Sequence, residues 1–427
     1  MFKKGNESLN FIDLFAGAGG LSEGFIQAGF NPIAHVEMNT PAAQTLETRA
    51  AYLYLKNRGR AIQWYYQYER GEITREQLFN HVPEAVTKTI INAEMSKKTL
   101  PGIFARVDEI MEEDGVDHVD VIIGGPPCQA YSLVGRAQSS HMLVPMDEDP
   151  RNELYKMYTG FLKKYKPKMF VFENVAGITS ARDGQVFKEL QDALDKVGYV
   201  AVPQLKNAAD FGVLQNRKRM IIIGWRKGTN HFYPDFAPNR SDAVVWDLLS
   251  DLDTVNRGEE NNAYRLNYDD CSNYLKRNKI RTRNDVVTHH IARPNNPRDV
   301  QIYEMAIQAY NDGGRRISYD QLPEELKTHR NQTSFKDRFK VVEGNDHACH
   351  TVLAHLAKDG HYFIHPDIAQ SRSITVREAA RLQTFPDNYY FEGNRGEKFN
   401  QIGNAVPPMM AKVIAEELKK QLVDSEE

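Results

Sequence analysis

The stretch that decides the fold reads Phe11-Ile12-Asp13-Leu14-Phe15-Ala16-Gly17-Ala18-Gly19-Gly20-Leu21. Its apolar first half predicts a β-strand over residues 9–15, and the glycines that follow predict a tight turn into a helix over residues 21–28. Glycine permits such a turn and lets a ligand approach the backbone closely. The sequence therefore predicts an α/β fold with a candidate ligand site where this first strand ends.

Two carboxylates accompany the turn. Glu37 follows a second predicted strand over residues 32–36, where a carboxylate can accept hydrogen bonds from ribose hydroxyls. Asp13, at the end of the first strand, could face an ammonium group. Ser22 replaces the third glycine of the G-x-G-x-x-G pattern, which disfavours a pyrophosphate ligand. Spacing alone leaves three interpretations open: an adenosyl cofactor, a nicotinamide or flavin dinucleotide, and a purely structural turn.

Further strands are predicted over residues 119–123, 169–172 and 220–225, separated by helical stretches. Strands that alternate with helices predict a parallel sheet with helices on both faces. Residues 48–100 interrupt this pattern with two or three predicted helices, including 50–70 and 74–81. This insert is either a hairpin that packs its own apolar face or a surface for a partner or DNA.

The composition changes after residue 225, where Asn, Arg, Asp, Tyr and Pro become more frequent. This change predicts a smaller, irregular second domain over residues 226–365. The chain returns to helix over 376–384, with Thr375 and Glu378 as a predicted capping box, and again over 407–422. Residues 366–427 are therefore expected to rejoin the first domain, residues 1–225.

The composition excludes several classes of protein. The chain has 427 residues, 41% of them hydrophobic, and no apolar run long enough to span a membrane. Its start leaves no room for a signal peptide before the first strand. The three cysteines are widely spaced and predict neither a disulfide framework nor a zinc site, which fits a reducing cytoplasm. The net charge of −3 does not by itself indicate a nucleic-acid binder.

Cys128 stands in the string Gly124-Gly125-Pro126-Pro127-Cys128-Gln129, directly after the predicted strand 119–123. The two prolines fix two φ angles and hold the thiol at one place in a loop. Most free cysteines are small buried hydrophobes that need no such mounting. The string therefore favours a nucleophilic thiolate over a structural cysteine.

Glu173 directly follows the strand 169–172, at the edge where ligands bind in open α/β sheets. Alone, it could also be a cap or an ion-paired side chain, but together with Cys128 it is a candidate catalytic acid. In the string Gln215-Asn216-Arg217-Lys218-Arg219, a lysine separates two arginines. This alternation predicts that Arg217 and Arg219 share one face of an extended segment.

These strings, in this order, resemble the cytosine-5 DNA methyltransferase family. The string Gln401-Ile402-Gly403-Asn404-Ala405-Val406-Pro407-Pro408 is similar to the family's last motif. The resemblance implies an α/β fold with a Rossmann-like sheet typical of S-adenosylmethionine-dependent methyltransferases, plus a smaller target-recognition domain. It implies transfer of a methyl group from S-adenosylmethionine, without a metal, to carbon 5 of a flipped-out cytosine in a specific double-stranded DNA sequence, leaving S-adenosylhomocysteine.

The resemblance also implies roles for individual residues. Catalysis would use Cys128, Glu173, Arg217 and Arg219. The cofactor pocket would contain Asp13, Phe15, Gly17, Gly19, Gly20, Glu37, Asp108, Pro127, Asn404, Ala405 and Val406. The DNA would meet Gln129, Ser132, Arg281, Arg283 and Thr351. Residues 129–149 are similar to the family's loop that closes over the flipped base.

A basic run supports contact with DNA. Residues 276–298 hold seven Lys and Arg but only one acid, Asp285, although such a run can also be a solvated face. Within it, Arg281 and Arg283 are the candidate phosphate anchors. The expected protein is a cytoplasmic, monomeric bacterial modification enzyme, bound to the nucleoid when on DNA, whose cognate endonuclease would act separately.

Three rival functions remain open. A tRNA cytosine-5 methyltransferase would share the same motifs, but the large basic recognition region favours duplex DNA. A non-catalytic DNA-binding regulator would not need Cys128, Glu173 and Arg219 together. A nicotinamide-dependent oxidoreductase gives no account of Cys128 or of the arginine string.

Overall fold

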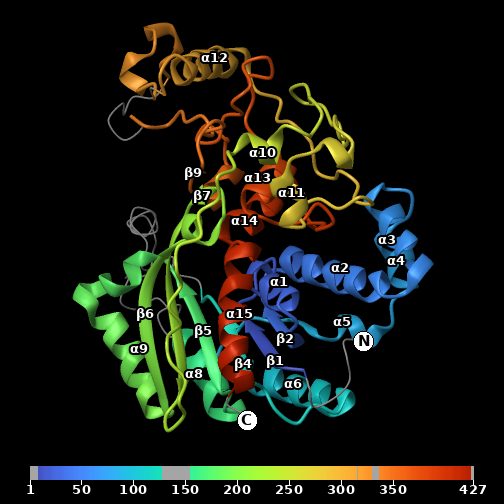
Figure 1. Cartoon of the computed structure of the whole chain (residues 1–427), viewed down its shortest axis with the longest axis vertical. Coiled ribbons are helices and arrows are strands. Elements are labelled where there is room, and N and C mark those ends of the chain that lie inside the picture. The colour runs from blue at the N-terminus through green and yellow to red at the C-terminus, as the bar shows by residue number, and fades with distance from the viewer. Residues whose placement is uncertain (1–7, 127–153, 315, 329–335, 425–427) are drawn as a thin grey trace.

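The computed structural model describes residues 8–126, 154–314, 316–328 and 336–424. The lower part of Figure 1 is a seven-stranded sheet in the order β3-β2-β1-β4-β5-β8-β6, with helices on both faces. Its strands are β1 (Asn10–Leu14), β2 (Asn31–Glu37), β3 (Ile90–Asn92), β4 (Val121–Gly124), β5 (Met169–Asn174), β6 (Tyr199–Asn207) and β8 (Lys218–Arg226). The described helices around them include α1 (Gly20–Gln27), α2 (Thr40–Lys56), α6 (Leu100–Asp114), α8 (Leu154–Tyr165), α9 (Gln185–Lys196) and α15 (Pro408–Asp424). The predicted α/β fold class is confirmed.

The sheet is mixed rather than parallel throughout. Strands β3, β2, β1, β4 and β5 pair in parallel, as expected, but β8 lies antiparallel between β5 and β6. The prediction of an all-parallel sheet was therefore wrong at β8. Only residues 208–217 separate β6 from β8, and a parallel return usually needs a crossover of a dozen or more residues, most often a helix. The chain therefore turns back and fills the gap beside β5.

Alternating side chains of the sheet build two cores. Ile12 and Leu14 of β1 pack toward α6, α8 and α9, whereas Phe11 of the same strand packs toward α1 and α15. Helices α1 and α15 cross closely at Gly24, where a Cβ would overlap the backbone nitrogen of Lys412. The last helix thus locks the glycine turn and the first helix onto the sheet.

The insert lies between α2 and β3. It consists of α3 (Ile62–Glu69), α4 (Arg75–Phe79) and α5 (Glu84–Thr87). The helix predicted over residues 50–70 is broken, because α2 ends at Lys56 and Gly59 adopts a φ of 60° that a continuing helix cannot accommodate. Tyr65 donates a hydrogen bond to the carbonyl of Asn388 at 2.9 Å, so the insert supports a distant loop.

The upper part of Figure 1 is an irregular second body. It contains α10 (Trp246–Leu249), α11 (Asn273–Arg277), α12 (Pro297–Asn311), α13 (Val376–Leu382), α14 (Arg395–Asn404) and a two-stranded sheet of β7 (Gln215–Asn216) with β9 (Cys349–His350). Helices α10, α11, α13 and α14 share one apolar core, while α12 has a separate core of its own. The capping box of Thr375 and Glu378 at the start of α13 is confirmed.

No helix among the described residues has the length and apolar character that crossing a bilayer requires. The domain boundaries at 225 and 365 stay a prediction. Residues 374–405 pack in the same core as residues 245–280, so this part of the C-terminal segment joins the two bodies before α15 returns to the sheet.

Candidate functional site

The candidate site lies where the strand order of the sheet reverses. Strand β1 is flanked by β2 on one side and by β4 on the other, and Leu14 pairs with Gly124 at the carboxyl ends of the two strands. In open α/β sheets, ligands bind in the crevice outside such a reversal. The glycine turn after β1 and the loop after β4 therefore start side by side.

The glycine turn is tied to Glu37. Phe15 and Gly17 have φ angles of 57° and 55°, so the chain leaves β1 in a left-handed conformation. The backbone N–H of Gly17 donates to one carboxylate oxygen of Glu37 at 2.8 Å, and the N–H of Asn39 donates to the other at 2.7 Å. Burial raises the pKa of Glu37, while these hydrogen bonds oppose the rise. The carboxylate is thus fixed beside the turn.

The closing motif packs directly on the same turn. A Cβ at Gly20 would overlap the carbonyl oxygen of Val406 and lie 3.0 Å from the Cβ of Ala405. Asn404, just before these two residues, is exposed at the end of α14. The structure therefore brings the closing motif against the glycine turn, and only glycine fits at position 20.

The residues around the turn fit a small adenosyl ligand. A Cβ at Gly17 would meet no atom within 4 Å, so the turn leaves open space beside Glu37. Asp13 is buried, and its Oδ2 has no hydrogen-bond partner among the described residues. Burial raises the pKa of Asp13 well above its usual range. An ammonium group would satisfy such an acceptor, because an unpaired buried polar atom is costly.

Two residues beside Glu37 were not among the residues singled out from the sequence. Met38, next to Glu37, is 60% exposed and offers apolar surface for a ring. The amide of Asn92, at the end of β3, donates to the carbonyls of Glu37 and Met38 at 2.9 and 3.1 Å. Met38 could have been found in the sequence as the apolar residue directly after Glu37. Asn92 could not, because its strand β3 has only three residues and shows no periodic pattern.

Asp108 lies away from the glycine turn. It lies on α6 about eight residues, or ~12 Å, beyond the end nearest β3. Its carboxylate accepts from Lys164 at 2.7 Å and from the hydroxyl of Tyr165 at 3.0 Å on the neighbouring α8. The prediction of a cofactor contact is corrected: Asp108 is a surface residue that links two helices.

Glu173 and Arg219, two of the predicted catalytic residues, lie side by side. Arg219, on β8, donates through Nε to Glu173 at the end of β5, at 2.9 Å. Burial raises the pKa of Glu173, and the charges of Arg219 and Arg217 partly offset this rise. A buried carboxyl with a raised pKa beside a guanidinium suits proton donation to a substrate atom.

Glu173 also lies against the loop that leads to Cys128. A Cβ at Gly125 would lie 2.8 Å from Oε2 of Glu173. The neighbouring Asn174 donates to the carbonyl of Pro126 at 3.4 Å. The predicted nucleophile Cys128 falls outside the described residues, as do Pro127, Gln129 and Ser132. Their assigned roles stay predictions, but the described start of their loop is packed on the candidate acid.

Arg217 has a different environment from Arg219. It is fully buried, and its guanidinium donates to the carbonyl of Val352 at 2.7 Å and to that of Gly403 at 3.0 Å. The expectation that the two arginines share one face is corrected, because residue 217 lies in the break between β7 and β8. Arg217 acts on the site through its charge and through the two segments that it joins.

The residues predicted to contact DNA also differ in their environments. Arg281 is buried, paired with Asp251 and stacked over the ring of Tyr264 at 3.5 Å, so the prediction that it binds a phosphate is corrected. Arg283 is 64% exposed and pairs with the equally open Asp269, which leaves its role a prediction. Thr351 donates to the carbonyl of Asn216, which places it directly beside the arginine string.

Comparison with known proteins adds the family. A model of the C-5 cytosine-specific DNA methylase family matches residues 9–58 and 94–420. The unmatched residues between them, 59–93, are those that fold into α3, α4, α5 and β3. The family model thus leaves the three helices of the insert and the short strand β3 unmatched.

The chain also has relatives along nearly its whole length. It is 41% identical to a type II methyltransferase, M.Bpa9945I of Bacillus paralicheniformis, over 96% of this chain and 98% of that protein. It is 28% identical to M.AgeI of Thalassovita gelatinovora over 96% and 98%. A solved E. coli prophage protein, described as a DNA modification methyltransferase, shares the fold with a TM-score of 0.64 at 24% identity, covering 97% of this chain and 100% of that one.

Proposed function

We propose that this chain, which belongs to the C-5 cytosine-specific DNA methylase family, methylates carbon 5 of a cytosine flipped out of double-stranded DNA. The observation that carries the proposal is the Glu173–Arg219 pair, packed on the loop before Cys128 and two strands along the sheet from the strand that leads into the glycine turn. A cytosine placed there would meet an acid, a guanidinium and a thiol from three neighbouring strand ends.

The base needs activation because carbon 5 of cytosine is a poor nucleophile. The Cys128 thiolate would add to carbon 6, which makes carbon 5 enamine-like. Glu173, whose pKa is raised by burial, would donate a proton to ring nitrogen 3, where electron density accumulates. Arg219 would hold the carbonyl oxygen through a planar guanidinium. Once carbon 5 carries the methyl group, loss of the carbon-5 proton to solvent expels the thiolate, and ring nitrogen 3 returns its proton to Glu173.

The methyl donor of the family is S-adenosylmethionine, whose sulfonium supplies an electrophilic methyl group when bound. Glu37 would accept from the ribose hydroxyls, with Phe15, Gly17, Gly19 and Gly20 forming the floor of the pocket. Asn404, Ala405 and Val406 would close it, and Asp13 would lie toward the ammonium group. Pro127 would meet the cofactor from the loop that carries the nucleophile.

The DNA must present its base outside the helix, because a stacked cytosine cannot reach these groups. Gln129 and Ser132 would contact the DNA beside the vacated position. Residues 226–365 would read the flanking bases, with Thr351 beside the flipped cytosine and Arg283 on a phosphate. As with the type II methyltransferases that it resembles, the chain would protect DNA against a separate endonuclease.

Purified protein, labelled S-adenosylmethionine and a mixed set of nucleic acids test the proposal. Expected is label in double-stranded DNA, at one cytosine of one sequence by single-base bisulfite sequencing. Label in tRNA but not in DNA would replace the proposed substrate. No transfer to any nucleic acid would refute the function.

A further inference from the structure

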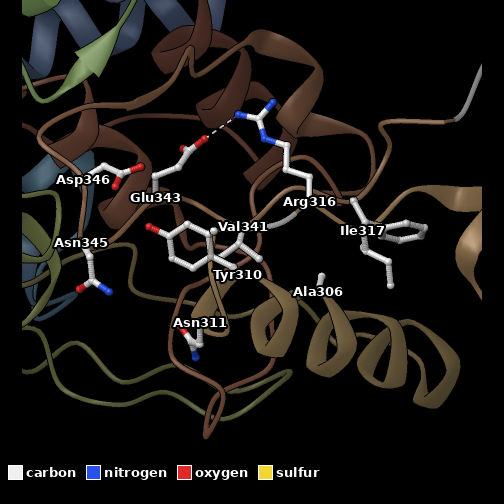
Figure 2. A pocket seen from close by; sticks show the side chains of 11 residues that line it. Ala306, Tyr310, Asn311, Arg316, Ile317, Val341, Glu343, Asn345 and Asp346 are labelled. Carbon is white, nitrogen blue, oxygen red and sulfur yellow. Dashed lines mark hydrogen bonds and ion pairs between the residues drawn. The ribbon is translucent and has the colours of Figure 1, made fainter.

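Arg316 is an exposed arginine with a buried partner. Its side chain is 55% exposed, yet it pairs at 2.9 Å with Glu343, whose side chain is only 12% exposed. Figure 2 shows the two side chains pointing toward one another at a cavity of about 320 Å³, between α12 and the chain around residue 341. The guanidinium therefore stands at the surface of the recognition segment, residues 226–365, in an orientation that the buried carboxylate sets.

Glu343 is itself held firmly. One of its oxygens accepts from the backbone N–H of His350 at 2.9 Å and lies 2.7 Å from Nδ1 of the same histidine. Nε2 of His350 lies 2.6 Å from the carbonyl oxygen of Tyr362, so both ring nitrogens have partners. Burial would raise the pKa of Glu343, but His350 outweighs it and lowers the pKa to about 2. The carboxylate therefore stays charged and keeps its orientation.

This chain of contacts leads to the catalytic side. His350 is on β9, which pairs with β7 at Asn216, and the next residue, Thr351, donates to the carbonyl of Asn216. Glu343 bonds His350 directly, and Arg316 bonds Glu343. The side chains of Glu343 and His350 thus connect Arg316 to β9, which directly precedes Thr351, the residue expected beside the flipped cytosine.

Arg316 has neighbours of both charges, since Glu343 and Asp346 line the same cavity. Lys340 lies close by, and its pKa is lowered, mainly by burial and further by the charge of Arg316. The Arg316 guanidinium donates to Glu343 through one terminal nitrogen, and its remaining donors lie on a half-exposed side chain. Guanine offers two acceptors, N7 and O6, in the major groove, and arginine matches them with two parallel donors.

We propose that Arg316, oriented by Glu343, reads a guanine close to the target cytosine. This inference rests on the proposed function and adds a specificity-determining residue to it. A bidentate arginine–guanine pair discriminates by ~1–3 kcal/mol, which corresponds to about 5- to 150-fold in kcat/KM.

The test compares Arg316→Ala, Arg316→Lys and Glu343→Gln with the unchanged protein, on DNA in which each base pair of the mapped site is replaced in turn. Arg316→Ala should lose the preference for guanine at one position and keep it elsewhere. Arg316→Lys should restore it only in part, because a lysine lacks the planar pair of donors. Glu343→Gln should weaken the preference at that same position, because the guanidinium loses the charge that orients it. Arg70→Ala, which breaks an exposed Arg–Glu pair on the insert, is the matched control and should keep the full site.

A second measurement needs no variant. Guanines of the site are replaced one at a time by 7-deazaguanine, which lacks the N7 acceptor, and the unchanged protein should lose about 5-fold or more at one of them. An unchanged preference in Arg316→Ala, equal losses at all positions, or no sensitivity to 7-deazaguanine overturns the inference. If the unchanged protein transfers no methyl group to DNA, the proposed function fails instead.

Discussion

Gly125→Ala tests how closely the acid is packed on the nucleophile's loop. The new Cβ would lie 2.8 Å from Oε2 of Glu173 and 3.2 Å from its carbonyl oxygen. Ordinary contacts begin at 3.4 Å, so the carboxylate must move by about 0.6 Å, the difference between 3.4 and 2.8 Å. That movement also disturbs its 2.9 Å pair with Arg219.

The effect should fall on catalysis rather than on folding. A misplacement of about 1 Å can cost ~10²-fold, so about 0.6 Å predicts a loss of about 10- to 100-fold in kcat. Cofactor affinity should change less than kcat, because the glycine turn follows another strand, β1, and Pro127 is the one predicted cofactor contact on this loop. The alanine also reduces the entropy of the unfolded chain, which offsets part of the steric cost.

Single-turnover methylation and thermal unfolding measure the two effects separately. Gly160→Ala is the matched control. Gly160 lies within α8, and its new Cβ would meet Leu100 at 3.5 Å and Phe104 at 3.9 Å on α6, both ordinary contacts. It should keep kcat and gain up to ~1 kcal/mol of stability. Turnover of Gly125→Ala at the rate of the unchanged protein would show that Glu173 is not held against this loop for catalysis.

Four further outcomes are expected. Cys128→Ser should abolish turnover, and DNA with 5-fluorocytosine at the target should trap an adduct that peptide mapping assigns to Cys128. Glu173→Gln should cost about 10²–10⁴-fold in kcat. Because the protonated form of Glu173 would be the donor and its pKa is raised, kcat of the unchanged protein should fall as the pH rises through that pKa. The glutamine variant should not show this fall. Arg219→Ala should lower kcat with little change in melting temperature, whereas Arg217→Ala should lower stability by ~1–3 kcal/mol per unpaired carbonyl. Exchange of residues 226–365 with those of a relative should move the methylated site, and an active exchange protein that marks the original site would contradict their role.

The sequence predicted best where the local chain dictates its own geometry. The glycine turn, the strands that carry Glu173 and lead to Cys128, and the capping box at Thr375 depend on residues that are neighbours in sequence. Glycine and proline restrict the backbone there, so their spacing carries structural information.

Charged residues were harder to place, because their partners are distant in sequence. Arg281 is neutralised by Asp251, thirty positions away, and nothing in the basic run around it shows that it is buried. Asp108 was assigned by its order among the motifs, and the insert before it obscures that order. Burial and long-range pairing decide such cases, and neither is visible in a local pattern.

Arg217 shows how the separate parts of the site depend on one another. Its guanidinium spans the carbonyls of Val352 and Gly403, which directly follow Thr351 and precede Asn404. The two backbones also touch, since a Cβ at Gly403 would overlap the nitrogen of Ala354. A shift of the predicted recognition segment should therefore reach the motif that is proposed to close the cofactor pocket, because the guanidinium cannot follow one carbonyl without leaving the other.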